Sequence, residues 1–86
     1  MNSYKIIFTG LVQGVGFRWH CKELCDMLKI DGYVKNLQDG TVELFIDTNK
    51  DMLDRIIRLL ECTFTITNVA IFKSTLAPCG GFSILR

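Results

Sequence analysis

The sequence predicts an α+β fold: a ferredoxin-like βαββαβ sandwich, with an antiparallel sheet, two helices on one face of it and a short closing strand at the C-terminus. Three observations predict this class. The segments follow one another as strand, helix, strand, strand, helix, strand. Both helical segments carry a single apolar stripe, which needs a surface to cover. The strand segments alternate apolar and polar residues, so one sheet face can meet both helices while the other is largely solvated.

Length and charge limit the possible partners. The chain has 86 residues, enough for one small domain over 1–86, and 49% of them are hydrophobic. Ten Lys and Arg residues against nine Asp and Glu residues give a net charge of +1, which argues against nucleic acid and membrane surfaces. The N-terminus has no signal-peptide pattern, and no apolar run reaches the roughly 18 residues of a membrane helix. We therefore expect a cytoplasmic protein, and we expect it to act as a monomer.

The first half of the chain supplies a strand, a helix and a second strand. The first strand is expected over about residues 4–10, where β-branched and aromatic residues dominate. The first helix is expected over about 17–28, because apolar residues recur there at i, i+4, i+7, i+8 and i+11. Residues 32–36 are predicted to be the second strand. The stripe of the first helix consists of Phe17, Cys21, Leu24, Cys25 and Leu28.

The second half repeats the pattern after a hairpin. An Asp-Gly pair at 39–40 marks the turn into a half-buried third strand over 41–47, where Val42, Leu44 and Ile46 alternate with Glu43, Phe45 and Asp47. Residues 48–51 offer an N-cap side chain and a first-turn acid for the second helix. A fourth strand is expected over 65–73, and Pro78 with two glycines separates it from a closing strand over 82–85. The stripe of the second helix consists of Met52, Leu53, Ile56, Ile57 and Leu60.

The chain has four cysteines, a number that allows two disulfides. They are Cys21, Cys25, Cys62 and Cys79. Two of them, Cys21 and Cys25, lie on the apolar stripe of the first helix, where a reduced cysteine packs as a small hydrophobe. A zinc site needs three or four converging ligands, which this pair does not supply with His20 pointing elsewhere. We expect core packing for these cysteines and no metal site.

The segment from Gly10 to Arg18, Gly-Leu-Val-Gln-Gly-Val-Gly-Phe-Arg, is the main functional candidate. A glycine-rich turn from a strand into a helix lets backbone N–H groups converge, and the helix N-terminus adds partial positive charge. Arg18 adds a planar fork of donors that suits a phosphate. The spacing matches neither a Walker loop nor a Rossmann fingerprint. Composition alone leaves two interpretations equally open, an anion site and a plain turn beside a solvated arginine.

Asn36 ends the second strand on the same sheet face as Val34. Its amide can hold a water molecule but has no useful pKa for removing a proton. Asparagine at a strand end commonly caps or turns the backbone, so a role in a site requires that Asn36 share a pocket with the Gly10–Arg18 loop. The ends of the first and second strands can approach each other in the predicted sheet.

Two signatures in this sequence resemble those of the acylphosphatase family. Val12-Gln13-Gly14-Val15-Gly16-Phe17-Arg18 is similar to the first signature, and Gly32-Tyr33-Val34-Lys35-Asn36, followed by Gly40 and Val42, is similar to the second. The resemblance covers essentially the whole chain. The chain departs from the family pattern at Thr48, where a glycine is usual, near Cys62, where a Gly-Pro pair is missing, and at Leu11, which replaces a frequently basic residue.

This resemblance implies an enzyme, a hydrolase that splits the carboxyl–phosphate bond of small acyl phosphates into a carboxylate and inorganic phosphate. It implies that Arg18 binds the phosphate and that Asn36 orients the attacking water. Recognition centred on the phosphate implies a broad range of acyl groups, and the sequence shows no obvious acyl pocket. No cofactor is expected, and the absence of a carboxylate cluster favours metal-independent activity. The loop residues implied to supply N–H groups are Gln13, Gly14, Val15, Gly16 and Phe17.

Two other functions remain open from the sequence. One is a non-catalytic phosphate- or anion-binding module on the same fold. The other is a ferredoxin-like RNA-binding domain that presents Phe45 with Tyr4, Phe8 or Ile7 for base stacking, although its basic-aromatic motif is absent. His20 invites a general-base role, but a packed or surface histidine is the more ordinary interpretation.

Overall fold

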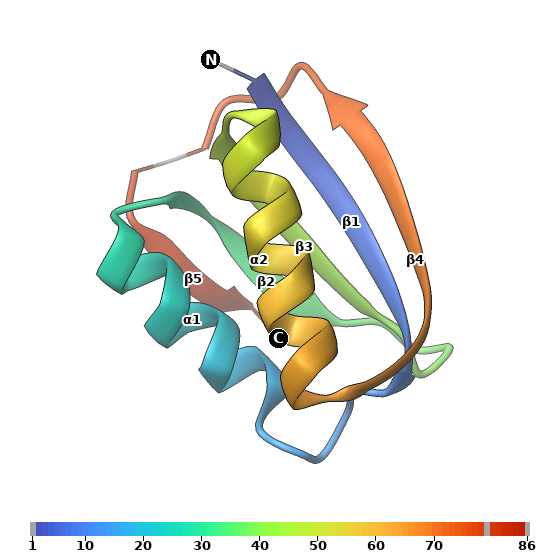
Figure 1. The fold of residues 1–86 in the computed structure, drawn as a ribbon. Coiled ribbons are helices and arrows are strands. Elements are labelled where there is room, and N and C mark those ends of the chain that lie inside the picture. Colours follow the sequence, from blue (N-terminus) through green and yellow to red (C-terminus); the bar gives the residue numbers. More distant parts are fainter. Residues whose placement is uncertain (1, 79, 86) are drawn as a thin grey trace.

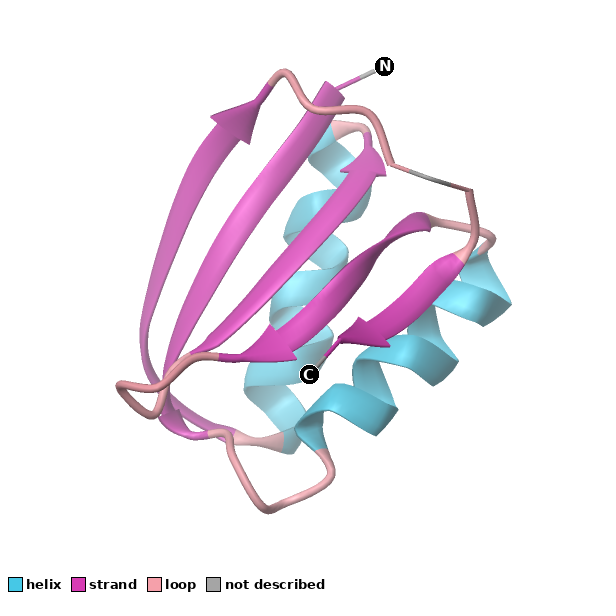
Figure 2. Cartoon of the chain, turned by 180° about the vertical axis from the view of Figure 1, so that it is seen from behind, coloured by secondary structure: helices cyan, strands magenta, loops and turns pink. Residues whose placement is uncertain are grey.

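The computed structural model describes residues 2–78 and 80–85. Both helices lie against one face of a five-stranded sheet (Figure 1), and the view from behind shows the strands in front of them (Figure 2). The fold is therefore α+β and ferredoxin-like, in the predicted order. The elements are β1 (Asn2–Leu11), α1 (Phe17–Leu28), β2 (Asp31–Asn36), β3 (Val42–Thr48), α2 (Lys50–Thr63), β4 (Thr65–Ser74) and β5 (Phe82–Leu85).

The sheet has the strand order β4-β1-β3-β2-β5, with β1 antiparallel to both of its neighbours. The closing strand differs from the expected antiparallel sheet, because β5 pairs parallel to β2 and makes the sheet mixed. The reason lies in the path of the chain. After β4 it passes to the other edge along the end of the sheet where β2 begins, so β5 starts beside Gly32 and runs in the same direction as β2.

The core lies between the sheet and the two helices. The predicted stripes face it, with Leu28 and Met52 half-buried at its margin. Cys21 and Cys25 are buried and unbonded, as expected, whereas Cys62 is exposed and Cys79 lies outside the described residues. Burial raises the pKa of both buried thiols, that of Cys25 to about 12. The fully buried side chains include Ile6, Phe8, Val34, Val42, Leu44, Ile46, Leu53, Ile56 and Leu60.

The sheet face away from the helices is less solvated at its centre than its alternation predicts. Phe45 is only 3% exposed, because its ring stacks on Tyr33 at 5.2 Å and the segment after β4 passes close to both. The Tyr33 hydroxyl donates to the Glu43 carboxylate at 2.6 Å. Since Tyr4 and Phe8 face the core, the aromatic residues considered for base stacking are covered on both faces.

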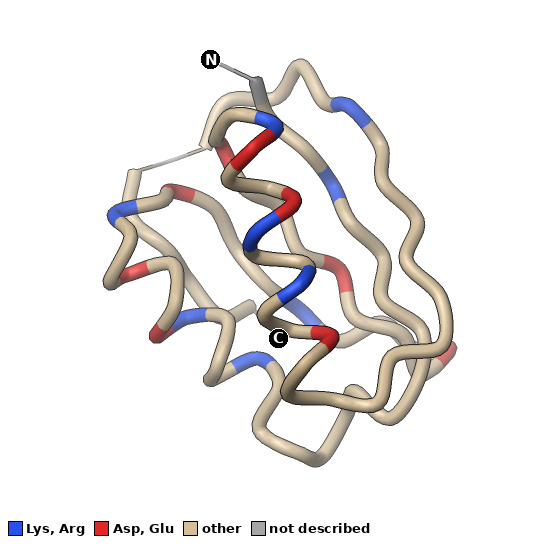
Figure 3. Tube along the Cα trace, viewed as in Figure 1, with Lys and Arg blue, Asp and Glu red and all other residues tan. Residues whose placement is uncertain are grey.

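The helices expose charged residues together with the apolar side chains of Trp19, Met27 and Leu59. Figure 3 shows acidic and basic residues along the whole length of α2, while the loop between β1 and α1 is free of both. Among the described residues, neither helix is long and apolar enough to cross a membrane.

Candidate active site

A cavity of about 240 Å³ opens at the end of the sheet where β1 and β2 end and α1 begins. The two side chains singled out from the sequence, Arg18 and Asn36, both line it. Of the predicted loop residues, Gly14, Gly16 and Phe17 also line it, whereas Gln13 and Val15 do not. The complete lining is Val12, Gly14, Gly16, Phe17, Arg18, Trp19, Asn36 and Ile84.

The loop wall of the cavity depends on two glycines in left-handed backbone conformations. Gly14 has a φ of 74° and Gly16 a φ of 82°, values that side-chain-bearing residues rarely adopt. Left-handed residues set among ordinary ones turn successive N–H groups toward one side, which creates a concave anion-binding surface. The glycines are therefore part of the site and not only of the turn.

The N-terminus of α1 is open to a ligand. Gly16 occupies the N-cap position without a side-chain hydrogen bond, and the first turn holds no acidic residue. By contrast, α2 is capped by Asn49, whose Oδ1 accepts from the Met52 N–H at 2.8 Å, and it has Asp51 in its first turn. The first N–H groups of any helix lack partners within the helix. In α1 these groups and the partial positive charge of the helix are available to an anion.

Arg18 is held in position by the packing of the residue before it. The Phe17 ring lies edge-on between Phe8, at 5.2 Å, and Phe64, at 4.9 Å, which anchors the start of α1. The Arg18 guanidinium donates a long hydrogen bond of 3.5 Å to the Leu85 carbonyl. Within residues 2–78 and 80–85 it has no carboxylate within 4.0 Å, so no acidic group of the described residues neutralises its charge.

Asn36 carries an unusual polar atom. Its side-chain oxygen Oδ1 is buried and has no hydrogen-bond partner in the described part of the chain. A buried polar group left unpaired costs about 1–3 kcal/mol, so native structures rarely keep one without a reason. An acceptor of this kind at a cavity wall suits a bound water molecule.

Gln13 and Val15 do not line the cavity, and their supply of N–H groups to a phosphate stays a prediction. The Gln13 side chain donates to the carbonyls of Leu37 and Thr41, at 2.8 and 2.9 Å, and so ties the loop to the β2–β3 turn. Val15 is 40% exposed at the outside of the loop. His20 is half-buried with its ring against Phe64 and lies outside the cavity, which agrees with a packed histidine.

The departure from the family pattern at Thr48 lies far from the cavity. Thr48 pairs with Asn2, whereas Val42, at the other end of β3, pairs with Asn36. Six residues of strand span roughly 20 Å. Thr48 is therefore too distant to shape the cavity directly.

Two lining residues were missed by the sequence analysis. One feature of the sequence could have indicated Trp19, namely its position immediately after Arg18. Ile84 had none, because it reaches the cavity only through the parallel pairing of β5 with β2.

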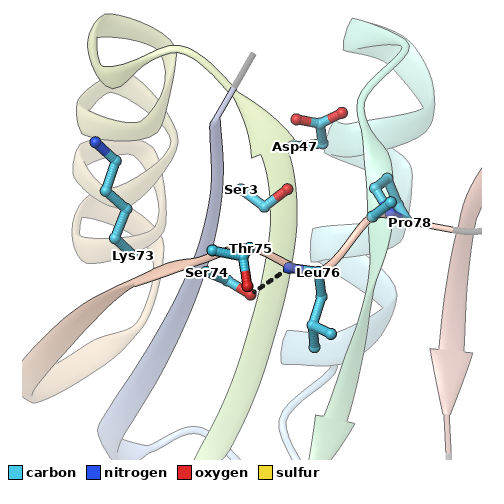
Figure 4. A pocket seen from close by; sticks show the side chains of 8 residues that line it. Ser3, Asp47, Lys73, Ser74, Thr75, Leu76 and Pro78 are labelled. Atoms are coloured by element: carbon cyan, nitrogen blue, oxygen red, sulfur yellow. Dashed lines mark hydrogen bonds between the residues drawn. The ribbon is translucent and has the colours of Figure 1, made fainter.

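A larger hollow of about 470 Å³ lies at the opposite end of the sheet and is a poorer candidate (Figure 4). Its lining includes Asp47, whose carboxylate repels a phosphate, as well as Lys73. The Ser74 hydroxyl oxygen accepts a hydrogen bond from the Leu76 N–H at 3.1 Å. No three His, Cys, Asp or Glu residues gather as a metal site within the part of the chain that the structure describes.

The fold and the cavity of about 240 Å³ define a small α+β domain with an arginine and an uncapped helix N-terminus at one cavity, groups that suit a phosphate. The sequence profile of the acylphosphatase family matches residues 4–78. The chain is 33% identical over 90 residues to an acylphosphatase of Methanospirillum hungatei JF-1, covering 100% of this chain and 99% of the relative. The chain belongs to the acylphosphatase family and is an enzyme of that type.

Solved structures agree with this assignment. The acylphosphatase from Bacillus subtilis superposes with a TM-score of 0.87 at 32% identity, with all of both chains covered. An acylphosphatase from Coxiella burnetii gives a TM-score of 0.86 at 25% identity, covering 98% of this chain and 92% of its own. None of these relatives supports the alternative of a non-catalytic anion-binding module.

Proposed function

We propose that this chain hydrolyses the carboxyl–phosphate bond of small acyl phosphates in the cavity between the Gly10–Arg18 loop and Asn36. The observation that carries the proposal is the meeting of two groups in one cavity: the Arg18 guanidinium, with no acidic partner among the described residues, and the buried, unpaired oxygen of Asn36. Transfer of a phosphoryl group to water requires a cationic clamp for the phosphate and a positioned water.

Arg18 and the start of α1 bind the phosphate. The guanidinium fork donates two parallel hydrogen bonds to phosphate oxygens, and the free N–H groups of the first helical turn approach from the loop side. In the transition state the charge spreads over the equatorial oxygens. Donors already fixed around those oxygens stabilise that charge without reorganisation.

Asn36 positions the water. Its Oδ1 accepts a hydrogen bond from the water, which fixes the water oxygen in line with the bond that breaks. The water oxygen forms a bond to phosphorus as the bond from phosphorus to the acyl oxygen breaks, and the electron pair leaves with the carboxylate. A carboxylic acid has a pKa of about 4, so no general acid is needed. The proton of the water passes to a phosphate oxygen, so no base from the protein is needed.

Every residue in this mechanism comes from one copy of the chain. Arg18 and the helix N-terminus supply the positive charge, so we expect turnover without a metal ion or cofactor. A cytoplasmic, monomeric enzyme with no nucleic acid or membrane partner stays a prediction.

The direct test is hydrolysis of benzoyl phosphate, followed by absorbance in the presence of a chelator. We expect Arg18→Ala to lower kcat/KM by roughly 10²–10³-fold, as loss of a transition-state donor commonly does. Arg18→Lys keeps the charge but loses the fork, so its loss should be nearly as large. Both variants should keep the circular dichroism spectrum of the parent.

Three other outcomes of this test would each contradict part of the proposal. Folded wild-type protein that binds phosphate without turnover contradicts the proposal and restores the non-catalytic module. Full activity in Arg18→Ala removes Arg18 from the mechanism. Loss of wild-type activity in chelator, restored by adding a divalent metal ion, contradicts metal independence.

A further inference from the structure

The cavity has an apolar wall beside its phosphate end. Trp19 follows Arg18 on α1, lines the cavity and leaves 61% of its surface exposed. Ile84 lines the same cavity from β5 and is half-buried against the core. Indole and sec-butyl surfaces contribute little to binding a phosphate, which is held by charge and N–H donors. Their place beside Arg18 therefore calls for a different part of the ligand.

The size of the cavity indicates how a substrate fits. Sites that enclose a drug-sized ligand measure about 300–1,000 Å³, and this cavity measures about 240 Å³. It can seat the phosphate and the atoms next to it, but a large acyl group extends out of it. On α1, the exposed Trp19 side chain lines the cavity together with Arg18.

We propose that Trp19 and Ile84 form an acyl subsite that favours acyl phosphates with aromatic or bulky apolar acyl groups over those with small ones. This inference rests on the proposed function. A flat acyl group lies against the indole face, and contact between aromatic rings adds attraction beyond simple area burial. An acetyl group is too small to cover the indole, so acetyl phosphate gains almost nothing there.

The test compares two substrates across four proteins. The proteins are the wild type, Trp19→Ala, Trp19→Phe and Met27→Ala, and the substrates are benzoyl phosphate and acetyl phosphate. Met27 is the matched control because it is an apolar residue of α1, 71% exposed, about 12 Å further along the helix. The intrinsic reactivity of each substrate is the same with every protein, so the change in the ratio of the two kcat/KM values reports the acyl contact alone.

We expect Trp19→Ala to lower kcat/KM for benzoyl phosphate about tenfold, mainly through KM, and that for acetyl phosphate less than twofold. Trp19→Phe should recover most of the loss, and Met27→Ala should change neither value. Equal losses for both substrates, or no loss in Trp19→Ala, overturns the proposal. Because the indole is largely exposed, the thermal midpoint of Trp19→Ala should stay close to that of the wild type, and this is measured first.

A binding experiment separates this inference from the proposed function. Phenacylphosphonate and acetonylphosphonate carry a CH₂ group in place of the bridging oxygen and cannot be hydrolysed at that position. Calorimetry should give at least about tenfold tighter binding of the phenacyl compound to the wild type and similar binding of the two to Trp19→Ala. Equal affinities in the wild type overturn the acyl subsite even when turnover is normal. If the wild type keeps this binding preference but does not hydrolyse benzoyl phosphate, the proposed function is contradicted and the acyl subsite is not.

Discussion

Gln13 donates a hydrogen bond of 2.8 Å from its side-chain nitrogen to the carbonyl oxygen of Leu37, the residue that follows Asn36. The same nitrogen donates to the Thr41 carbonyl at 2.9 Å. One amide group therefore joins the glycine loop at the start of α1 to the turn that directly follows Asn36. The two halves of the cavity cannot separate unless both hydrogen bonds break.

Gln13→Ala should weaken this connection. We expect a loss of about 1–2 kcal/mol in the free energy of unfolding, because two hydrogen bonds are lost while the Leu37 and Thr41 carbonyls keep the N–H groups of Gly40 and Leu37 as donors, and about a tenfold lower kcat/KM. Gln13→Glu should be worse on both measures, since a carboxylate faces two carbonyl oxygens and has no hydrogen to donate. Urea unfolding and benzoyl phosphate kinetics give the two values. Full activity in Gln13→Glu shows that the site does not need the connection.

Asn36→Ala should separate catalysis from stability. We expect kcat to fall at least about 100-fold while the affinity for inorganic phosphate changes less than twofold, because Arg18 and the helix N-terminus are intact. Removing a buried unpaired oxygen should leave the thermal midpoint unchanged or raise it by a few degrees. An asparagine with a purely structural role predicts the opposite, a lower midpoint with turnover kept.

Gly16→Ala tests the left-handed N-cap of α1. An added Cβ meets no atom within 4 Å, so the cost is conformational, about 1–2 kcal/mol. Relaxation of this strain displaces the N–H groups of the first turn, and we expect kcat/KM to fall more than tenfold. Gly80→Ala is the matched control, because Gly80 has a similar φ of 85° and equally open surroundings but does not line the cavity. The stability of Gly80→Ala should fall by a similar amount while its activity is kept. Equal losses of activity in the two variants contradict the role given to Gly16.

The two buried thiols of α1 should make stability depend on alkaline pH. Burial raises the pKa of Cys25 to about 12 and that of Cys21 as well, from an ordinary value of 9.0. Above about pH 9 the unfolded chain releases these protons while the folded chain keeps them. The free energy of unfolding therefore falls as the pH rises, by up to about 1.4 kcal/mol per pH unit and thiol, and the full stabilisation is present below pH 9.

Urea unfolding between about pH 7 and pH 10.5 measures this slope. The variant with both Cys21→Ala and Cys25→Ala should be less stable at pH 7, because it leaves cavities in the core. Its stability should nevertheless decline less steeply with pH than that of the wild type. The same slope in both proteins shows that other groups govern the alkaline limit.

Local patterns predicted most of the fold and drew attention to Arg18 and Asn36, which line one cavity. The stripes of the two helices, the cap at Asn49 and the hairpin at Gly40 are set by neighbouring residues, so the sequence shows them directly. The meeting of Arg18 and Asn36 follows from the order of the elements, since strand and helix ends gather at one end of the sheet. The helix and turn predictions rest on short-range periodicity, and the meeting of the two side chains rests on the rules of chain connection.

Contacts between distant segments were beyond the reach of the sequence. The direction of β5 depends on the path of the chain after β4, and that path also covers Phe45, which alternation placed on the solvated side. The hydrogen bonds of Gln13 to the β2–β3 turn, and the arrival of Ile84 at the cavity, have no local signature in the chain. Each of these depends on tertiary packing that a pattern of apolar and polar residues does not encode.

The central place of β1 in the sheet has a consequence for how fast the chain folds. Ser3 pairs with Asp47 on one side and with Ser74 on the other, so the first strand reaches its final state only after almost the whole chain has closed on itself. Closing long loops before contacts are gained is slow, and sheets of this kind fold in milliseconds to seconds. During that time the isoleucines and phenylalanine of β1 are uncovered and can pair with other chains. Refolding yield should therefore fall with protein concentration even where the native enzyme is stable.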